Sequence, residues 1–340
     1  MRDLFSQLDL ILARDPGGRR LPSFARRPEL AGWERLVESF SIERPVVAIV
    51  TGFCVAAVRP PAAETDGPPG ALALAALLAQ LGAEVRFVTD RFGVPLLEAG
   101  CDELGLSRAW IDEMPLAVEF ADTAPALWTT RWLRGPIGNR LTHLVAIERV
   151  GPSHTLESLR DQTRCGVPAP VAQFEQLVPA AERDVCHNMR GASIDAVTAP
   201  THLLFDAVAA RTKTVTTVGM ADGGNELGCG AILWEEIVAA LGPDPGARIA
   251  CRVSTDHLLL AGVSDWAAYA ACVAIAERRA SRSALAEVTI ARQQRLLGAL
   301  VEAGAVDGCT ARREQSVDGL SAAEYLAPLA ELRALVGLAG

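Results

Sequence analysis

Short apolar runs alternate along the chain with longer stretches that carry a helical pattern. The short runs are rich in valine and isoleucine, which favour buried strands, and glycine or polar residues bound them. The longer stretches have the length and spacing of helices. We expect strands at residues 46–53, 83–90, 143–151 and 247–254, a further strand ending near Met220, and helices at 1–12, 71–82, 94–105, 202–211 and 265–279.

Strands that alternate with helices favour parallel pairing, because each crossover needs a covering segment. We therefore predict an α/β fold with a mainly parallel, doubly wound sheet and helices on both faces. Residues 1–44 should form an N-terminal helix and a loop, the loop lying in the Pro-, Gly- and Arg-rich stretch 15–32, and residues 45–335 the α/β domain. Residues 110–140 carry no clear pattern and suggest a cap or insertion. Sheets of this kind bind ligands at the C-terminal ends of their strands.

Composition narrows the class of protein. The 340 residues are 50% hydrophobic, enough for one large core or two closely packed halves. The net charge of −9 disfavours nucleic acid and anionic membranes as partners, so we expect a small-molecule substrate. No apolar run reaches membrane-spanning length and the N-terminus lacks the features of a signal peptide, which predicts a cytoplasmic protein. A homo-oligomer is left open.

Lysine, cysteine and histidine usage limits the chemistry further. Lys213 is the only lysine, so a Schiff base with pyridoxal phosphate would depend on that one residue, and we expect no such cofactor. The eight cysteines form no CxxC pair and the five histidines are isolated, so no zinc or redox motif is present in the sequence.

Acidic and glycine-rich segments follow several of the predicted strands. In ETDGPPGA (64–71), Thr65 or Asp66 can cap the next helix, and Gly67 lies in a stiff backbone that a ligand can approach closely. A helix start of this kind can bind an anion, although a plain capped helix explains the same residues.

Glu148 and Arg149 lie at the end of a buried strand. A carboxylate there cannot stay unpaired, so Glu148 needs Arg149, another cation or a metal ion, and a structural ion pair is the simplest alternative. Further along, NMRG (188–191) sets Arg190 beside Asn188, where a guanidinium could hold a carboxylate through two parallel hydrogen bonds.

The strongest candidate is the block DGGNE, residues 222–226, which follows a strand. Gly223 and Gly224 permit positive φ and a close approach of ligand to backbone. Asp222 and Glu226 offer oxygen ligands for a hard cation, or a base and an acid. The block is neither a dinucleotide fingerprint nor a Walker A loop.

Taken in order, these motifs resemble the D-glutamate cyclase family. The matching stretches are TGF (51–53), ETDGPPGA (64–71), HLVAIER (143–149) with Gly151, NMRG (188–191), DGGNELG (222–228), AGVSDW (261–266) and VDGL (317–320). The resemblance spans about residues 45–330 and implies conversion of D-glutamate into 5-oxo-D-proline and water. In animals this domain follows another one in a mitochondrial protein, whereas here we expect it to stand alone without a targeting peptide.

Two of these motifs depart from the family pattern. Ala221 and Cys229 stand where the family usually has Gly and Met, and Asp265, Ala267 and Ala268 where it often has Asn and paired glycines. An acid at position 265 could alter how an amine or a carboxylate is received.

The residue types suggest a mechanism. Acids around an amino-dicarboxylate make electrostatic sense only with a cation, so we expect Mg²⁺ or Mn²⁺ held by some of Asp66, Glu148, Asp222 and Glu226. Asp222, Glu226 and Glu148 are the candidate catalytic acids, and Arg149 or Arg190 should hold the substrate carboxylate. The predicted substrate-binding set is Thr65, Gly67, Arg149, Asn188, Arg190, Gly223, Gly224 and Asn225. Two alternatives use the same cluster: a metal-dependent hydrolase or phosphatase of a small anion, and a non-catalytic amino-acid sensor.

Overall fold

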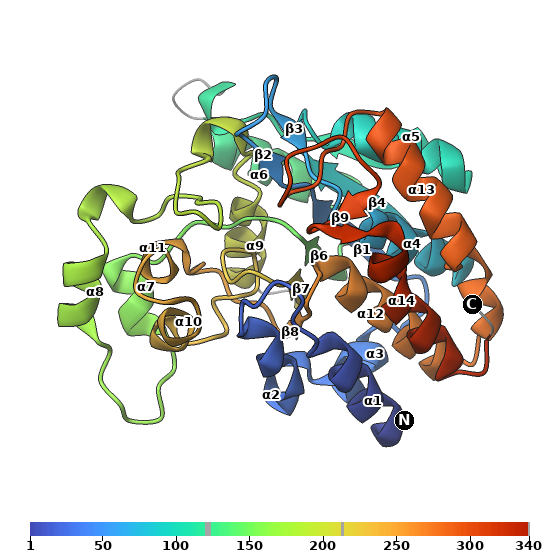
Figure 1. Ribbon diagram of the computed structural model, residues 1–340, viewed down its shortest axis with the longest axis horizontal. Coiled ribbons are helices and arrows are strands. Elements are labelled where there is room, and N and C mark those ends of the chain that lie inside the picture. The colour runs from blue at the N-terminus through green and yellow to red at the C-terminus, as the bar shows by residue number, and fades with distance from the viewer. Residues whose placement is uncertain (120–123, 212–213, 339–340) are drawn as a thin grey trace.

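The computed structural model describes residues 1–119, 124–211 and 214–338. Within these residues, a six-stranded sheet in the order β5-β4-β1-β6-β7-β8 lies at the centre of the molecule (Figure 1). Every pair of neighbouring strands in it is parallel. The strands are β1 (Val46–Thr51), β4 (Glu84–Thr89), β5 (Ile111–Glu113), β6 (His143–Ile147), β7 (Thr216–Ala221) and β8 (His257–Leu260).

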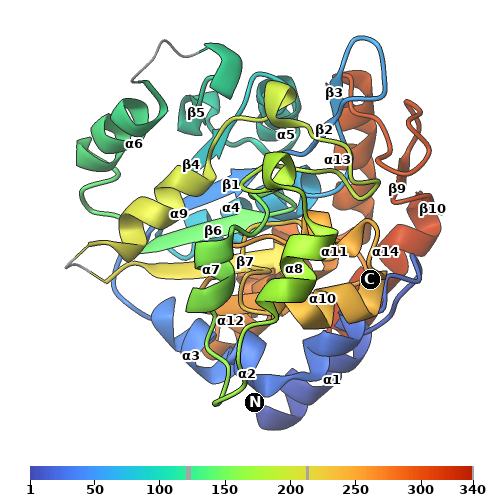
Figure 2. The ribbon, with the colours of Figure 1, turned by 90° about the vertical axis from the view of Figure 1, so that its left-hand side faces the viewer.

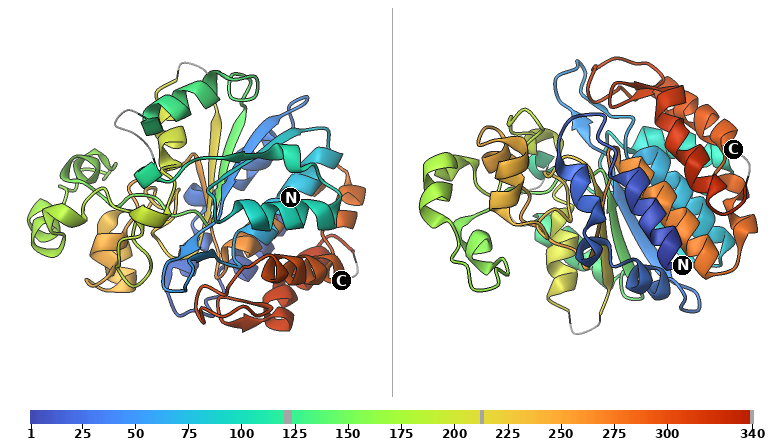
Figure 3. Two further views of the ribbon diagram at one scale, coloured as in Figure 1. Left: turned by 90° about the horizontal axis from the view of Figure 1, so that it is seen from above. Right: turned by 60° about the horizontal axis from the view of Figure 1, so that its bottom comes forward.

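Helices cover both faces of the sheet, which confirms the predicted fold (Figures 2 and 3). One face carries α4 (Pro68–Gln80), α5 (Val94–Leu104), α12 (Ser264–Arg278), α13 (Ile290–Glu302) and α14 (Ala322–Ala334). The other carries α6 (Ala124–Arg134) and α9 (His202–Ala209). Four helices group to one side of the sheet in Figure 1: α7 (Leu156–Asp161), α8 (Val171–Leu177), α10 (Trp234–Leu241) and α11 (Gly246–Ile249).

The strand order creates a crevice at one end of the sheet. From β1 the chain winds outward through β4 and β5, then returns to the other side of β1 and continues through β6, β7 and β8. The winding direction therefore reverses between β1 and β6, whose last residues Thr51 and Ile147 pair with each other. Because the crossovers diverge at such a reversal, open sheets bind ligands above it, at the C-terminal ends of the strands.

The helices α4 and α12 begin beside this crevice and exchange caps. The Asp66 carboxylate accepts hydrogen bonds from the backbone N–H groups of Ser264 and Asp265, both 3.0 Å long, at the start of α12. The Asp265 carboxylate accepts from the N–H groups of Gly67, at 3.1 Å, and Gly70, at 2.7 Å, at the start of α4. Each helix thus has its free N–H groups satisfied by an acid that precedes or begins the other helix.

This exchange requires close approach of the two helices. A Cβ atom on Gly70 would lie 2.6 Å from Asp265 Oδ1 and 2.8 Å from Ala268 Cβ, so only glycine fits there. From the sequence, Thr65 or Asp66 was expected to cap the helix that follows it. In the structure, the Asp66 carboxylate accepts from the N–H of Gly67 and also from donors of the distant helix α12. The Asp265 carboxylate accepts from Gly67 and Gly70 at the start of α4.

One predicted strand is wrong. Residues 247–254 hold no strand: Ala247–Ile249 belongs to α11, and β8 follows at His257–Leu260. The run is apolar and largely buried, and burial alone does not distinguish a short helix from a strand. Its sheet-like contacts are isolated bridges, such as Ser153 with Cys251.

Regular elements lie in the stretch predicted as a loop, 15–32, and in the one predicted as a cap or insertion, 110–140. Residues 15–32 include a 3₁₀ helix at Leu21–Arg26 and α2 (Pro28–Ala31). Residues 110–140 include the edge strand β5 and α6, and so contribute directly to the sheet, although 120–123 lie outside the described residues. Lys213, on which a pyridoxal phosphate enzyme would depend, also lies outside them.

The N-terminal segment packs against the rest of the chain. Apolar side chains of α1 (Arg2–Leu12) and α3 (Trp33–Ser39) belong to the same buried cluster as the strands of the sheet. The short strands β2 (Cys54–Val55) and β3 (Ala62–Ala63) form a hairpin after β1, and β9 (Ser316–Val317) and β10 (Leu320–Ser321) precede α14. No helix in the described part of the chain combines the length and apolar character needed to cross a membrane.

The cap exchange predicts a specific loss of stability. Replacing Asp265 by alanine should lower the free energy of unfolding by about 2–4 kcal/mol, because Gly67, Gly70 and the Tyr325 hydroxyl, which donates at 2.7 Å, lose a buried acceptor. Denaturant unfolding measures this change.

The matched control is Asp265→Asn, which keeps an acceptor oxygen. Burial raises the pKa of Asp265 to about 6, so the folded protein carries this charge at a cost near neutral pH, and an amide avoids that cost. We expect Asp265→Asn to lose about 1 kcal/mol or less. Equal losses for the alanine and asparagine variants would contradict the role of the caps.

Candidate active site

A cavity of about 220 Å³ opens at the reversal point of the sheet. Loops that follow β1, β6 and β7 contribute to it, together with the N-terminal loop and the segment before α14. Its lining is unusually acidic for its size. The residues are Arg19, Phe53, Cys54, Val55, Ala56, Ala57, Glu64, Glu148, Asn188, Met189, Arg190, Asp222, Gly308, Cys309, Ala311 and Asp318.

Three of the predicted metal ligands lie close together, and two of them, Glu148 and Asp222, line this cavity. Asp66, Glu148 and Asp222 are buried, and each has a carboxylate oxygen within 4.8 Å of the other two. They follow β1, β6 and β7, three neighbouring strands of the sheet. The structure thus brings together acids that are 82 and 74 residues apart along the chain (148 − 66 and 222 − 148).

Glu148 reaches this position through an uncommon backbone conformation. Its φ is +43°, in the left-handed region that residues other than glycine rarely adopt, and it directly follows β6. Such conformations cost on the order of 1–3 kcal/mol and gather at functional sites. The Ser264 hydroxyl donates to Glu148 Oε2. Gly67 lies so close that a Cβ there would be 2.7 Å from Glu148 Cβ.

Glu226, the fourth predicted ligand, is turned back into its own loop. Its carboxylate oxygens accept hydrogen bonds from the N–H groups of Gly223, at 2.8 Å, and Gly224, at 2.7 Å. The Asn225 side chain donates to the carbonyl of His187 at 2.8 Å. These contacts fix the DGGNE loop internally, and Asp222 is the member of the loop that lines the cavity.

The Arg149 guanidinium donates its hydrogen bonds to other protein groups. Its Nη1 donates to Asp90 at 2.6 Å and to the carbonyl of Gly52, its Nη2 to Ala199 at 2.8 Å and its Nε to Thr201 at 3.1 Å. It is fully buried and does not line the cavity. The expected grip on substrate is therefore not supported, and the expected ion pair with Glu148 is replaced by one with Asp90.

Two other predicted contacts shape the cavity walls. Asn188 Oδ1 accepts from the N–H groups of Arg190 and Ala192, both at 3.0 Å, which forms a turn and leaves the exposed Arg190 at the cavity. The Thr65 hydroxyl donates to the carbonyl of Ser316 at 2.8 Å, tying the loop after β1 to the C-terminal segment.

Sequence reasoning missed three charged residues of the cavity. Arg19 forms ion pairs with Asp222 and with Asp318, the latter at 2.9 Å. Glu64 is buried, and a Cβ on Gly308 would lie 2.1 Å from Glu64 Oε2, so glycine makes room for this carboxylate. Glu64 and Asp318 lie inside motifs already noted, ETDGPPGA and VDGL, whereas nothing distinguished Arg19 among the many arginines.

The buried acids lack compensating charge. Burial is the largest cause that raises the pKa values of Asp66, Glu148 and Asp222 well above the usual range, and neighbouring carboxylates raise them further. Arg19 opposes this effect at Asp222. Removing carboxylates from water is costly unless a cation accompanies them.

These residues fit a hard divalent cation. The donor atoms of the cluster are all carboxylate oxygens, the ligand type that Mg²⁺ and Mn²⁺ take. Asp222 Oδ2 is buried, and Arg19 Nη1 is its ion-pair partner in this structure.

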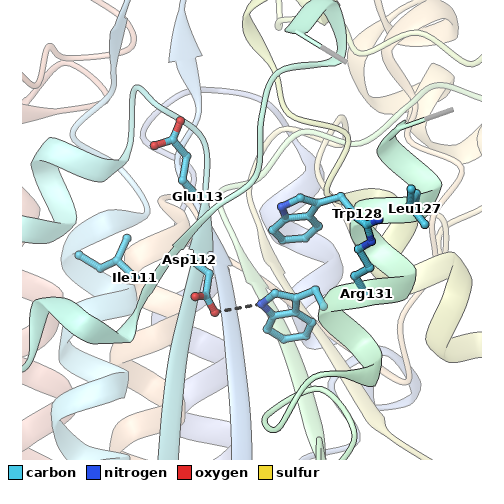
Figure 4. A pocket seen from close by; sticks show the side chains of 7 residues that line it. Ile111, Asp112, Glu113, Leu127, Trp128 and Arg131 are labelled. Atoms are coloured by element: carbon cyan, nitrogen blue, oxygen red, sulfur yellow. Dashed lines mark hydrogen bonds between the residues drawn. The ribbon is translucent and has the colours of Figure 1, made fainter. Parts of the chain in front are cut away.

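A larger cavity, of about 500 Å³, lies at the edge of the sheet between β5 and α6 (Figure 4). The rings of Trp128 and Trp132 stack there with centroids 6.4 Å apart, and the Trp132 indole donates to Asp112 at 2.9 Å. It does not contain the acid cluster and is built around the sheet edge, so we place the candidate active site in the smaller cavity. The larger cavity is lined by Ile111, Asp112, Glu113, Leu127, Trp128, Arg131 and Trp132.

Comparison with known proteins identifies relatives of this chain. Residues 8–183 and 173–333 match the family model described as D-glutamate cyclase-like, C-terminal. The chain belongs to the D-glutamate cyclase-like family. It is 30% identical over 271 residues to the human protein "D-glutamate cyclase, mitochondrial". That match covers 79% of this chain but 38% of the human protein, so the chain spans well under half the length of this relative.

Membership of the D-glutamate cyclase-like family confirms the resemblance seen in the motifs. The family match extends back to residue 8 and so includes Arg19, which the motif-based resemblance, beginning near residue 45, did not. The acid triad of this D-glutamate cyclase-like chain, Asp66, Glu148 and Asp222, lies within the matched range.

The electrostatics predict how stability should depend on pH. A carboxyl whose pKa is raised in the folded state contributes stability below its unfolded pKa and loses it as pH rises through the folded value. We expect the metal-free protein to lose thermal stability as the pH rises above the ordinary range of carboxyl pKa values, and added Mn²⁺ to restore more of it at the higher pH. Thermal midpoints at several pH values, with and without Mn²⁺, test this expectation.

The control is Asp222→Asn, which removes one of the shifted carboxyls. Its midpoint should fall less steeply with rising pH than that of the wild type, and Mn²⁺ should stabilise it less. A pH slope and Mn²⁺ response equal to the wild type would show that Asp222 does not belong to the charged cluster.

Proposed function

We propose that the protein is a lyase that cyclises D-glutamate, or a closely related amino-dicarboxylic acid, to 5-oxo-D-proline and water. The observation that carries the proposal is the buried triad Asp66, Glu148 and Asp222 at the reversal point of the sheet, in a chain of the D-glutamate cyclase-like family. The name of the human relative supports the same reaction.

The reaction sets three requirements. The substrate amine must lose a proton and attack the side-chain carboxyl of the same molecule, and the oxygen that leaves must be protonated to water. The enzyme must hold the substrate folded, so that nitrogen and carboxyl carbon come close together. A cavity of about 220 Å³ is small enough to enforce a compact conformation of such a substrate.

A divalent cation held by Asp66, Glu148 and Asp222 would polarise the reacting carboxyl as a Lewis acid. Glu64 and Asp318 line the same cavity and supply acceptors for the substrate ammonium group. A carboxylate of the cluster takes the proton that the ammonium group releases, as a general base. Glu226 maintains the conformation of the loop that presents Asp222.

The proposal also includes the expectations from the sequence about partners, pyridoxal phosphate and cellular location. The partner is a small molecule, with neither nucleic acid nor a membrane bound, and a homo-oligomer stays open. The chemistry as written has no step for pyridoxal phosphate. The cytoplasm remains the predicted location, with a mitochondrial relative as the alternative to test.

Incubation with D- and L-glutamate and Mn²⁺ or Mg²⁺, followed by chiral detection of 5-oxoproline, tests the function. We expect 5-oxo-D-proline from D-glutamate. Turnover of phosphate esters without glutamate turnover would instead favour a metal-dependent phosphatase, and tight glutamate binding without product would favour a sensor.

Asp222→Asn keeps the shape of the side chain and removes its charge, so it should lower turnover by about 10²–10⁴-fold, as expected for loss of one positioned acid or base. The matched control is Asp161→Asn, at an exposed position outside the cavity, which should keep wild-type turnover. A folded Asp222→Asn variant with wild-type turnover would place the chemistry elsewhere.

A further inference from the structure

Arg19 is a buried cation in a cavity dominated by acids. Two arginines line the described part of this cavity, and Arg190 is exposed, whereas the Arg19 side chain is only 15% exposed. The carboxylates that it contacts, Asp222 and Asp318, are 3% and 11% exposed. Arg19 therefore supplies the internal positive charge that the acid cluster has in this structure.

The N-terminal loop that carries Arg19 is firmly positioned. The Asp15 carboxylate accepts hydrogen bonds from the N–H groups of Arg19, at 2.9 Å, and Arg20, at 2.6 Å. Leu21 is fully buried and so close to the DGGNE loop that a Cβ on Gly224 would lie 2.8 Å from Leu21 Cδ1. The backbone of Arg19 is thus held against the loop that presents Asp222.

The contact between Arg19 and Asp222 is an ion pair that lacks hydrogen-bonding geometry. The two groups form an ion pair through Nη1 and Oδ2, yet among the described residues neither of these buried atoms has a partner in hydrogen-bonding geometry. By contrast, Nη2 donates to Asp318 at 2.9 Å. The guanidinium is therefore held between Asp318, to which it donates a hydrogen bond, and Asp222, with which it forms an ion pair.

We propose that Arg19 is an exchangeable counter-ion of Asp222: a divalent cation takes its place at this carboxylate, and the released Nη1 then holds the α-carboxylate of the substrate. This inference rests on the proposed function. Asp222 belongs to the triad that fits a cation, and a cation bound there would compete with Arg19 Nη1 for its negative charge. Asp318 keeps the guanidinium in the cavity during the exchange.

The substrate carries two carboxyl groups, and only one of them reacts. The reacting carboxyl lies at the cation in the proposed function, so the α-carboxylate needs a separate positive partner. Arg149 is unavailable because its nitrogens already donate to Asp90, Gly52, Ala199 and Thr201. Arg19 is inside the cavity and can offer a charge-assisted hydrogen bond.

The first test uses Mn²⁺ alone, titrated into metal-free wild type, Arg19→Gln, Arg19→Lys and the control Arg20→Gln, with calorimetry as the readout. Arg20 is the adjacent residue, is exposed and does not line the cavity. Arg19→Gln should bind Mn²⁺ about tenfold more tightly, because the ion no longer displaces a cation from Asp222. Arg19→Lys and Arg20→Gln should stay near the wild type. Unchanged or weaker binding by Arg19→Gln would overturn the exchange.

The second test asks what the released guanidinium holds. With Mn²⁺ saturating, Arg19→Gln and Arg19→Lys should raise the KM for D-glutamate about 10–100-fold, with a smaller change in kcat, because a bond to the unreacting carboxylate is lost. Inhibition by 5-oxo-D-proline, which keeps that carboxylate, should weaken equally. Inhibition by 2-pyrrolidinone, the same ring without the carboxylate, should not change.

The outcomes separate this inference from the proposed function. If wild-type protein does not turn over D-glutamate, the proposed function fails, while the Mn²⁺ titrations still decide whether Asp222 exchanges Arg19 for a metal ion. If turnover occurs and both Arg19 variants bind 5-oxo-D-proline like the wild type, the carboxylate role is wrong. Thermal midpoints identify unfolded variants, and if Arg19→Gln does not fold, Arg19→Lys with the two inhibitors decides the carboxylate role.

Discussion

The exchange of caps between Asp66 and Asp265 is the contact on which the site geometry depends. Each carboxylate is buried and is satisfied chiefly by N–H groups at a helix start. The exchange fixes where α4 and α12 begin, and it also places Ser264, whose hydroxyl binds Glu148. One contact therefore connects the packing of two core helices with the positions of two members of the acid triad.

The charge balance of the cavity explains its other features. Glu64, Glu148, Asp222 and Asp318 line a small volume with one buried guanidinium. A fold selected only for stability would not concentrate uncompensated carboxylates in this way, because their desolvation opposes folding. The left-handed backbone of Glu148 adds a further cost at the same place. Both costs are understandable if the cluster must receive a cation and a charged substrate.

The sequence predicted the parts of the structure that depend on local pattern. Apolar runs predicted β1, β4 and β6, and the acids and glycines that follow β1, β6 and β7 predicted where the site would form. It did not predict the direction of individual side chains. Glu226 and Arg149 have suitable residue types, but backbone donors and Asp90 engage them, and only tertiary contacts decide this.

Arg19 was missed because no local sequence pattern distinguishes it. It lies in a Pro-, Gly- and Arg-rich stretch with no hydrophobic periodicity, and its role follows from where the loop packs. The strand wrongly predicted at 247–254 shows the same limit. An apolar run indicates burial but does not distinguish a strand from a helix.

The location of Arg19 bears on how the catalytic unit should be delimited. A boundary drawn at residue 44, where the alternating pattern begins, would leave the whole sheet in one fragment and Arg19 in the other. Such a fragment would retain Asp66, Glu148 and Asp222 while losing their nearest guanidinium and the leucine that packs on Gly224. Recombinant versions trimmed to the sheet would then have an altered electrostatic environment, so the N-terminal segment with Arg19 and Leu21 belongs to the smallest piece of chain on which this site should be studied.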